Sequence, residues 1–170
     1  MQRSYTIQHY RKVVDECRRL VPGIALATDF IVGFCGETDA EFEETVKLVE
    51  EVRFNGAYIF KYSERPGTPA ADLENDVPEE VKRERNQVLL GIQRGISLEL
   101  NSESIGRETE VLVEGLSKKD KTRWSGRNRK HQIVVFPVKG NEDLTGKLVT
   151  VKVTEVTQVV LVGERRGKGS

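Results

Sequence analysis

A short apolar run, followed by a glycine turn and a helix start, constrains the fold of this chain most strongly. Residues 24–32 are nearly all apolar, which is typical of a strand buried on both faces of a parallel sheet. The run breaks at Gly33 and Gly36, and Thr38 and Glu41 follow at the spacing of a helix capping box. This order predicts a ligand-binding edge at the carboxyl end of the strand. A plain tight loop explains the glycines equally well.

Helical and strand patterns alternate through the first hundred residues. Apolar side chains repeat at helical spacing over residues 7–21, 42–52 and 78–101. Residues 57–62 are rich in aromatic and β-branched side chains, which predicts a second strand. Because helices and strands alternate, the sequence predicts a parallel sheet with helices packed outside it.

The loop after the second predicted strand, residues 63–71, contains two prolines and one glycine. If the two strands are neighbours, this loop lies beside the glycine turn at the same edge of the sheet. Arg65 is then placed to bind a carboxylate or a phosphate at the mouth of the site. An exposed arginine in an ordinary turn is the alternative.

Charge is unevenly distributed, although the chain has 27 basic and 27 acidic side chains. Residues 1–102 carry 13 basic and 18 acidic side chains, and residues 103–170 carry 14 and 9. This asymmetry favours two domains, the second with a polyanion as its partner. With no stretch of transmembrane length and no apolar leader, we expect a cytoplasmic protein without membrane contact. Cys17 and Cys35 are too isolated for a disulfide framework or a metal-ligand spacing.

The helical period ends near residue 102, and five short strand candidates follow. They span residues 109–113, 123–126, 132–136, 148–156 and 159–163. Five strands in so short a segment predict a small closed barrel of the oligonucleotide-binding sort. A basic run with one aromatic residue lies between and along them: Lys118, Lys119, Lys121, Arg123, Trp124, Arg127, Arg129 and Lys130. Such a run can neutralise phosphates and stack a base, which favours RNA, with Arg127 and Arg129 as contacts. The alternatives are a basic loop that only aids solubility and a core position for Trp124.

The segments ATDFIVGFCGET, YIFKYSERPGTPAA, VPEEVKRER and GLSKKDKTRWSGRNRKHQIVVF together resemble the radical S-adenosylmethionine tRNA methylthiotransferases. The resemblance implies an α/β plus all-β fold. Residues 1–102 are then the C-terminal part of a parallel radical-enzyme (β/α) partial barrel. Residues 103–166 are a five-stranded, OB-like TRAM β-barrel that binds RNA, and residues 167–170 are a disordered tail. Only two barrel strands are present, so we expect an unpaired strand edge and an exposed sheet face.

The family that the sequence resembles adds a methylthio group to C2 of an N6-modified, isopentenyl-type adenosine next to the tRNA anticodon. It uses S-adenosylmethionine and two 4Fe–4S clusters. The resemblance implies that the S-adenosylmethionine pocket includes Val32, Gly33, Phe34, Gly36, Glu37, Tyr62, Ser63 and Arg65. Relatives that modify a ribosomal protein have an acidic residue where Arg65 and Pro66 stand here, which favours a tRNA substrate.

Two departures from the family pattern bear on activity. Cys35 stands where the family has proline, and we interpret it as a substitution rather than a cluster ligand. The three-cysteine cluster motif and the N-terminal cluster domain have no counterpart in this sequence. The chain is therefore expected to be inactive alone and catalytic only with a cluster-binding half. The alternative is a non-catalytic module that binds tRNA through its barrel.

Overall fold

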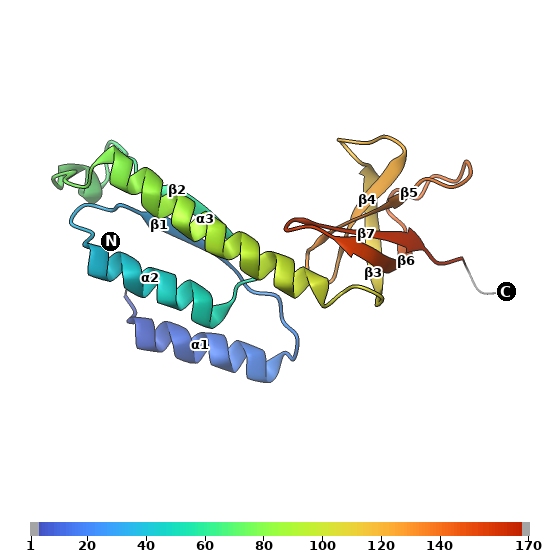
Figure 1. The fold of residues 1–170 in the computed structure, drawn as a ribbon, viewed down its shortest axis with the longest axis horizontal. Helices are drawn as coiled ribbons and strands as arrows, with labels where there is room; N and C mark the ends of the chain where they lie inside the picture. Colours follow the sequence, from blue (N-terminus) through green and yellow to red (C-terminus); the bar gives the residue numbers. More distant parts are fainter. Residues whose placement is uncertain (1–3, 168–170) are drawn as a thin grey trace. The chain divides into compact units, whose positions relative to one another are not determined.

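The computed structural model describes residues 4–167, which form an α/β unit and a β-barrel unit (Figure 1). The elements are α1 (Ile7–Leu20), β1 (Ala27–Val32), α2 (Asp39–Val52), β2 (Gly56–Lys61), a 3₁₀ turn (Pro69–Asp72), α3 (Glu79–Ser102), β3 (Glu108–Leu116), β4 (Arg123–Asn128), β5 (Ile133–Pro137), β6 (Leu148–Val156) and β7 (Val160–Arg165). The chain divides into two compact units after Ile96, within α3, whereas the sequence placed the boundary after residue 102. The expected tail, residues 167–170, lies outside the described residues except for Gly167.

The first two helices begin at side-chain caps, and the second is the capping box that the sequence predicts. At α1, the hydroxyl of Thr6 accepts a hydrogen bond from the backbone N–H of His9 at 3.3 Å. At α2, the Glu41 N–H donates to the Thr38 hydroxyl at 3.2 Å, and the Thr38 N–H donates to the Glu41 carboxylate at 2.9 Å. This reciprocal capping box satisfies two backbone donors that a helix start otherwise leaves unpaired.

The two strands of the α/β unit are parallel neighbours, as the alternating pattern predicts. Ala27 pairs with Gly56, and Val32 pairs with Lys61. The Tyr62 N–H donates to the Val32 carbonyl at 2.8 Å, which extends the pairing one residue beyond β2. The carboxyl ends of β1 and β2 therefore meet at one edge of the sheet.

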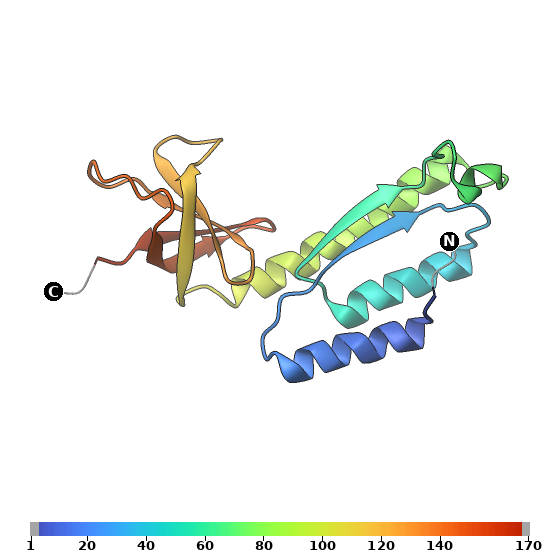
Figure 2. The same cartoon turned by 180° about the vertical axis from the view of Figure 1, so that it is seen from behind.

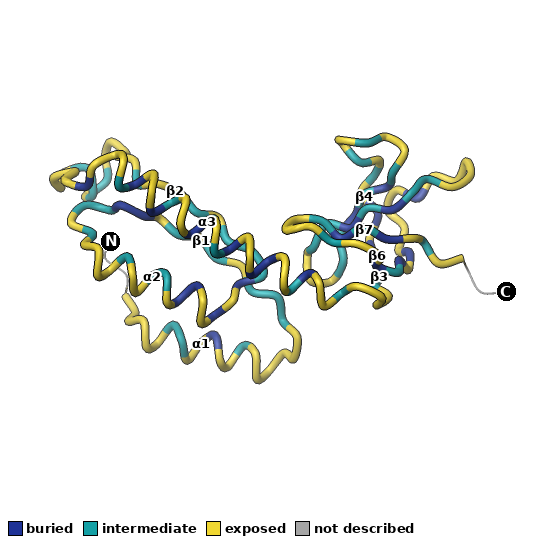
Figure 3. Tube along the Cα trace, in the orientation of Figure 1, coloured by how far each residue is buried: buried dark blue, intermediate teal, exposed yellow. Residues whose placement is uncertain are grey.

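One face of this sheet packs on helices and the other is open. The packed face contributes to a core that includes Val32 and Phe54. Figure 2 shows both strands in front of α3, with their near face uncovered. On that open face Ile31, Tyr58 and Phe60 are 39%, 68% and 54% exposed, and Figure 3 shows the alternation along the strands. The predicted exposed face is confirmed, whereas burial of the first strand on both faces is wrong because helices cover only one of them.

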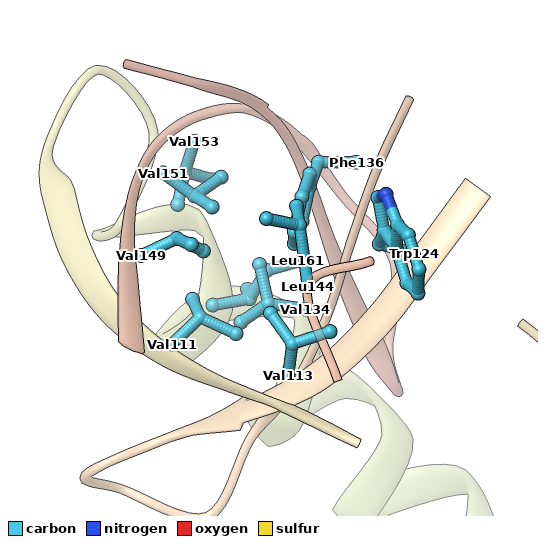
Figure 4. Close-up of a cluster of buried hydrophobic side chains, with 10 residues drawn as sticks. All are labelled: Val111, Val113, Trp124, Val134, Phe136, Leu144, Val149, Val151, Val153 and Leu161. Atoms are coloured by element: carbon cyan, nitrogen blue, oxygen red, sulfur yellow. The ribbon is translucent and has the colours of Figure 1, made fainter. Parts of the chain in front are cut away.

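The second unit is the five-stranded closed barrel that the sequence predicts, with strand order β3-β4-β5-β7-β6. Among the described strands of this barrel, only β5 and β7 pair in parallel. Two glycines allow neighbouring strands to approach closely. A Cβ atom on Gly126 would lie 2.2 Å from the Leu112 carbonyl oxygen, and one on Gly163 would lie 2.3 Å from that of Lys152. Figure 4 shows the side chains that fill the barrel: Val111, Val113, Trp124, Val134, Phe136, Leu144, Val149, Val151, Val153 and Leu161.

The last turns of α3 are bonded to one end of the barrel. Asn101 is 7% exposed, and its amide donates to the Thr157 carbonyl at 2.8 Å. The Gln132 amide donates to the Asn101 side-chain oxygen, also at 2.8 Å. Through these bonds Asn101 joins the β4–β5 hairpin to the β6–β7 hairpin. These contacts explain why the division into units falls inside the helix.

Candidate functional site

The turn after β1 is fastened to α3 by a buried ion pair. The Glu37 carboxylate accepts a hydrogen bond from the Gly33 N–H at 2.5 Å and one from the Arg85 guanidinium at 2.7 Å. A second nitrogen of Arg85 donates to Asp39 at 2.7 Å. Arg85 is only 5% exposed, so these bonds form where water competes little. Glu37 thus acts as a brace between the glycine turn and the helix.

Arg85 remains charged in this buried position. Burial by itself would lower the pKa of its guanidinium, but the hydrogen bonds with Asp39 and Glu37 outweigh that effect and raise the pKa. The guanidinium therefore keeps its charge across the whole physiological pH range. Sequence patterns alone gave no sign of Arg85, because nothing local distinguishes it from the exposed charges along the same helix.

Both the backbone angle and the packing at position 33 require a glycine. The φ of Gly33 is 69°, in the left-handed region. A Cβ atom at this position would also lie 2.3 Å from Cγ of Lys82, whose residue is 3% exposed. The Lys82 ammonium donates to the Asn75 side chain and lies 5.3 Å from the centre of the Tyr62 ring. Lys82 therefore contacts the residues that follow both strands, and sequence patterns did not indicate it either.

The ends of β1 and β2 border a hollow of about 490 Å³. The rings of Phe34 and Tyr62 meet edge to face there, with centres 5.0 Å apart, and Ser63 and Arg65 also line the hollow. The expectation that the two loops lie at the same sheet edge is confirmed. A hollow of this size, with mainly apolar walls and a few polar groups, suits a small organic ligand.

The Tyr62 hydroxyl is held in place and kept neutral. It donates to the Ala70 carbonyl at 3.0 Å. Desolvation raises the pKa of this hydroxyl, and the neighbouring Cys35 and Glu64 raise it further. The phenol therefore stays protonated well above neutral pH.

The eight predicted cofactor residues fall into two groups. Phe34, Tyr62, Ser63 and Arg65 line the hollow between the strand ends. The remaining residues have other roles. Val32 is fully buried, and the Gly36 N–H donates to Asp76 at 2.7 Å, just as the Gly33 N–H is bonded to Glu37. Phe34, Gly36 and Glu37 also border an adjacent groove of about 510 Å³ beside the start of α1.

The described residues offer no site for an iron–sulfur cluster. Among residues 4–167, no three His, Cys, Asp or Glu side chains are grouped so that they could hold a metal ion. Cys17 and Cys35 are both free thiols. A 4Fe–4S cluster is bound by several cysteine thiolates, so the residues present do not fit one. Within the same described range, no helix is long and apolar enough to cross a membrane.

The predicted basic run is divided between the two ends of β4. Lys118, Lys119 and Lys121 lie in the loop before this strand, and Arg129 and Lys130 lie in the turn after it. The arginines are ion-paired. Arg123 pairs with Asp120 at 3.3 Å, Arg127 with Glu114 at 3.1 Å, and Arg129 with Glu110 at 3.0 Å.

Trp124 belongs to the barrel core. It is 7% exposed and lies opposite Phe136 on the neighbouring strand (Figure 4). A base cannot stack on a ring that the barrel already covers, so the predicted stacking role is wrong. Trp124 is covered because it lies, like Gly126, on the inward-facing side of β4, where these two residues alternate with outward-facing neighbours.

Both units of the chain are similar to known proteins. A family model described as the TRAM domain matches residues 103–164. Several curated bacterial proteins named tRNA-2-methylthio-N(6)-dimethylallyladenosine synthase match nearly the whole chain. The protein from Carboxydothermus hydrogenoformans is 51% identical over 155 residues, which cover 91% of this chain and 35% of that protein. The protein from Moorella thermoacetica is 47% identical over 164 residues, or 96% and 36% of the two chains.

The match to a third such synthase, from Clostridioides difficile, is 46% identical over 156 residues and covers 32% of that protein. The chain thus spans about a third of the length of the curated relatives it matches. Identity at this level extends through both the α/β unit and the barrel, because each match covers nine-tenths or more of this chain. Over nearly its whole length the chain is similar to proteins named tRNA-2-methylthio-N(6)-dimethylallyladenosine synthase, and its residues 103–164 match the TRAM domain.

Proposed function

We propose that this chain forms part of a tRNA methylthiotransferase, in which it supplies one wall of the S-adenosylmethionine site and the tRNA-binding barrel. The observation that carries the proposal is the convergence of the β1 and β2 ends on one hollow, in a chain about half identical to the named synthases. The substrate is then tRNA, and the position modified is C2 of an N6-modified adenosine next to the anticodon. Such a protein works in the cytoplasm, where tRNA is modified.

The residues at the strand ends fit an S-adenosylmethionine molecule. The rings of Phe34 and Tyr62 offer apolar surface to a nucleoside, and the exposed guanidinium of Arg65 can pair with the amino-acid carboxylate. The shape of this wall is maintained by residues that do not line the hollow, namely Val32, Gly33, Gly36 and Glu37. When bound, S-adenosylmethionine supplies the radical and the methyl group, while the chain's own residues bind it, orient it and exclude water.

The two 4Fe–4S clusters have no ligands among the described residues of this chain, so they belong to another part of the enzyme. The matched relatives are about three times longer than their aligned segments. That length can provide a cluster-binding half, whose strands would also cover the open face of the β1–β2 sheet. The chain is accordingly expected to be inactive alone.

A chimeric enzyme tests the proposal. The matching segment of the Carboxydothermus hydrogenoformans synthase is replaced by this chain, and the chimera is expressed in a bacterial strain without its own synthase. Mass spectrometry of digested tRNA should then detect the methylthiolated adenosine. The Arg65→Ala chimera should lose most of it, while Arg94→Ala, an exposed position on α3 that does not line the hollow, should not.

A second candidate is a non-catalytic module that only binds tRNA. The compact barrel, with its own closed core and unpaired lysines, favours it. A chimera that folds, carries its iron and sulfide and binds tRNA but forms no methylthiolated adenosine would support this candidate against the first.

A further inference from the structure

Four of the unpaired cations among the described barrel residues gather at one end, while another, Lys130, lies in the β4–β5 turn at the opposite end of β4. The β3–β4 loop and the β5–β6 loop are neighbours at the first of these ends, because the Val138 N–H donates to the Thr122 carbonyl at 2.8 Å. Four exposed lysines lie in these two loops: Lys118, Lys119, Lys121 and Lys139. None of the four takes part in an ion pair among the described residues 4–167. We call these four residues the loop lysines.

The opposite end of β4 carries arginines whose charge is already compensated. Glu114 and Glu110, on the outer face of β3, pair with Arg127 and Arg129. Arg127 also donates to the His131 carbonyl at 3.1 Å. A phosphate approaching these arginines meets two carboxylates at the same time, and each ion pair would have to open before the arginine could bind it.

The end at the hairpins is also sterically occupied. Asn101 of α3 bonds to both the β4–β5 and the β6–β7 hairpins, and this closes that end of the barrel with protein. At the loop end, Leu144 of the β5–β6 loop packs into the barrel core, while all four loop lysines remain exposed. The exposed, unpaired charge of these lysines therefore favours the loop end as the surface for a polyanion.

We propose that the barrel contacts RNA through the loop lysines. Arg127 and Arg129, which we call the hairpin arginines, instead stabilise the barrel through their ion pairs with Glu114 and Glu110. This inference rests on the proposed tRNA binding and specifies its surface. Lysine ammonium groups act as point charges on phosphates, and Trp124 is not available for stacking. The barrel thus contributes affinity and orientation with little base specificity, and the selection of the adenosine falls to the rest of the enzyme.

Charge-matched double variants of the full chain test this assignment. One variant is Lys118→Gln with Lys119→Gln, and its counterpart at the other end of β4 is Arg127→Gln with Arg129→Gln, which removes the two ion-paired arginines. The measurement is fluorescence anisotropy with a labelled anticodon stem–loop RNA over a series of KCl concentrations. The loop variant should weaken binding at low salt by roughly tenfold or more and reduce the slope of log Kd against log salt by about one to two. The hairpin variant should change both quantities much less.

The possible outcomes separate the two proposals. If the unaltered chain binds no RNA, both the proposed tRNA binding and this inference fail. If it binds RNA and the hairpin variant loses as much affinity as the loop variant, or more, the surface assignment fails while tRNA binding stands. Stronger binding to phosphatidylserine vesicles than to RNA, lost in the loop variant, would assign the lysines to a membrane surface and overturn the inference. Trp124 fluorescence verifies that each variant keeps its barrel folded.

Discussion

Single residues in the turn after β1 decide whether the proposed cofactor wall keeps its shape. Gly33 and Gly36 both have positive φ values, 69° and 78°. Only Gly33 is crowded, since a Cβ atom would collide with Lys82 there, whereas nothing lies within 4 Å at Gly36. The two glycines thus separate the effect of backbone strain from that of packing.

Gly33→Ala should destabilise the α/β unit by about 3 kcal/mol, which combines left-handed strain with overpacking. Gly36→Ala carries only the strain and should cost about 1 kcal/mol. The measurement is urea unfolding followed by helical circular dichroism, because the α/β unit contains most of the helix. Equal losses for the two variants would show that the Lys82 contact does not restrict this position.

Arg85→Met should leave the Glu37 carboxylate poorly paired in a buried place and cost about 3 kcal/mol of unfolding free energy. The matched control is Asp39→Asn, because Asp39 binds the same guanidinium but its side chain is 93% exposed, and its loss should stay within about 1 kcal/mol. A neutral Arg85→Met would contradict the bracing role of the ion pair.

These residues also mark the limit of sequence reasoning at this scale. The glycines were recognisable because a turn between a strand and a helix has a local pattern. Lys82 and Arg85 were not, because their partners Gly33 and Glu37 are distant in sequence and only the fold brings them together. Burial of a charge is a property of the assembled structure, and a charged residue in a helix is exposed more often than not.

At the scale of elements, the sequence predicted what depends on neighbours along the chain. The starts of α1 and α2, the parallel β1–β2 pair and the five barrel strands all follow from caps, periodicity and turn residues. The surface formed by the basic run could not be predicted in this way, because it depends on where the strands place its residues. Residues continuous in sequence are separated when a strand runs between them, and β4 carries Lys121 and Lys130 to opposite ends of the barrel.

The α2 capping box predicts a pH-dependent contribution to stability. Hydrogen bonds from Thr38 lower the pKa of the Glu41 carboxyl below its usual value. The bonds therefore stabilise the folded state above the carboxyl's unfolded pKa, and this stabilisation disappears as the pH falls through the lowered folded pKa.

Thr38→Ala should cost about 1 kcal/mol at neutral pH and should reduce the loss of stability on acidification to about pH 3. Thr45→Ala, in the same helix but away from its start, is the control and should cost nothing, because alanine has the higher helix propensity. Thermal melting followed by helical circular dichroism at the two pH values provides the measurement. Because alanine keeps the backbone N–H that also donates to Glu41, unchanged acid sensitivity in Thr38→Ala would argue against the Thr38 hydroxyl as a source of the pH dependence.

At the scale of the whole molecule, the two units can be followed separately in one experiment. Trp124 is the single tryptophan of the chain and lies in the barrel core, so its fluorescence reports unfolding of the barrel. Helical circular dichroism reports mainly the α/β unit. Arg85→Met and Gly33→Ala should therefore shift the circular dichroism transition and leave the fluorescence transition in place. Variants of the loop lysines should shift neither.

The central claim is that the ends of β1 and β2 form one wall of a nucleoside site. It is tested most directly by NMR amide chemical-shift mapping of the full chain titrated with S-adenosylmethionine. The perturbed amides should cluster at Phe34, Tyr62, Ser63 and Arg65, and the barrel amides should stay unchanged. Perturbations confined to the barrel, or none at ligand concentrations in the millimolar range, would contradict the claim.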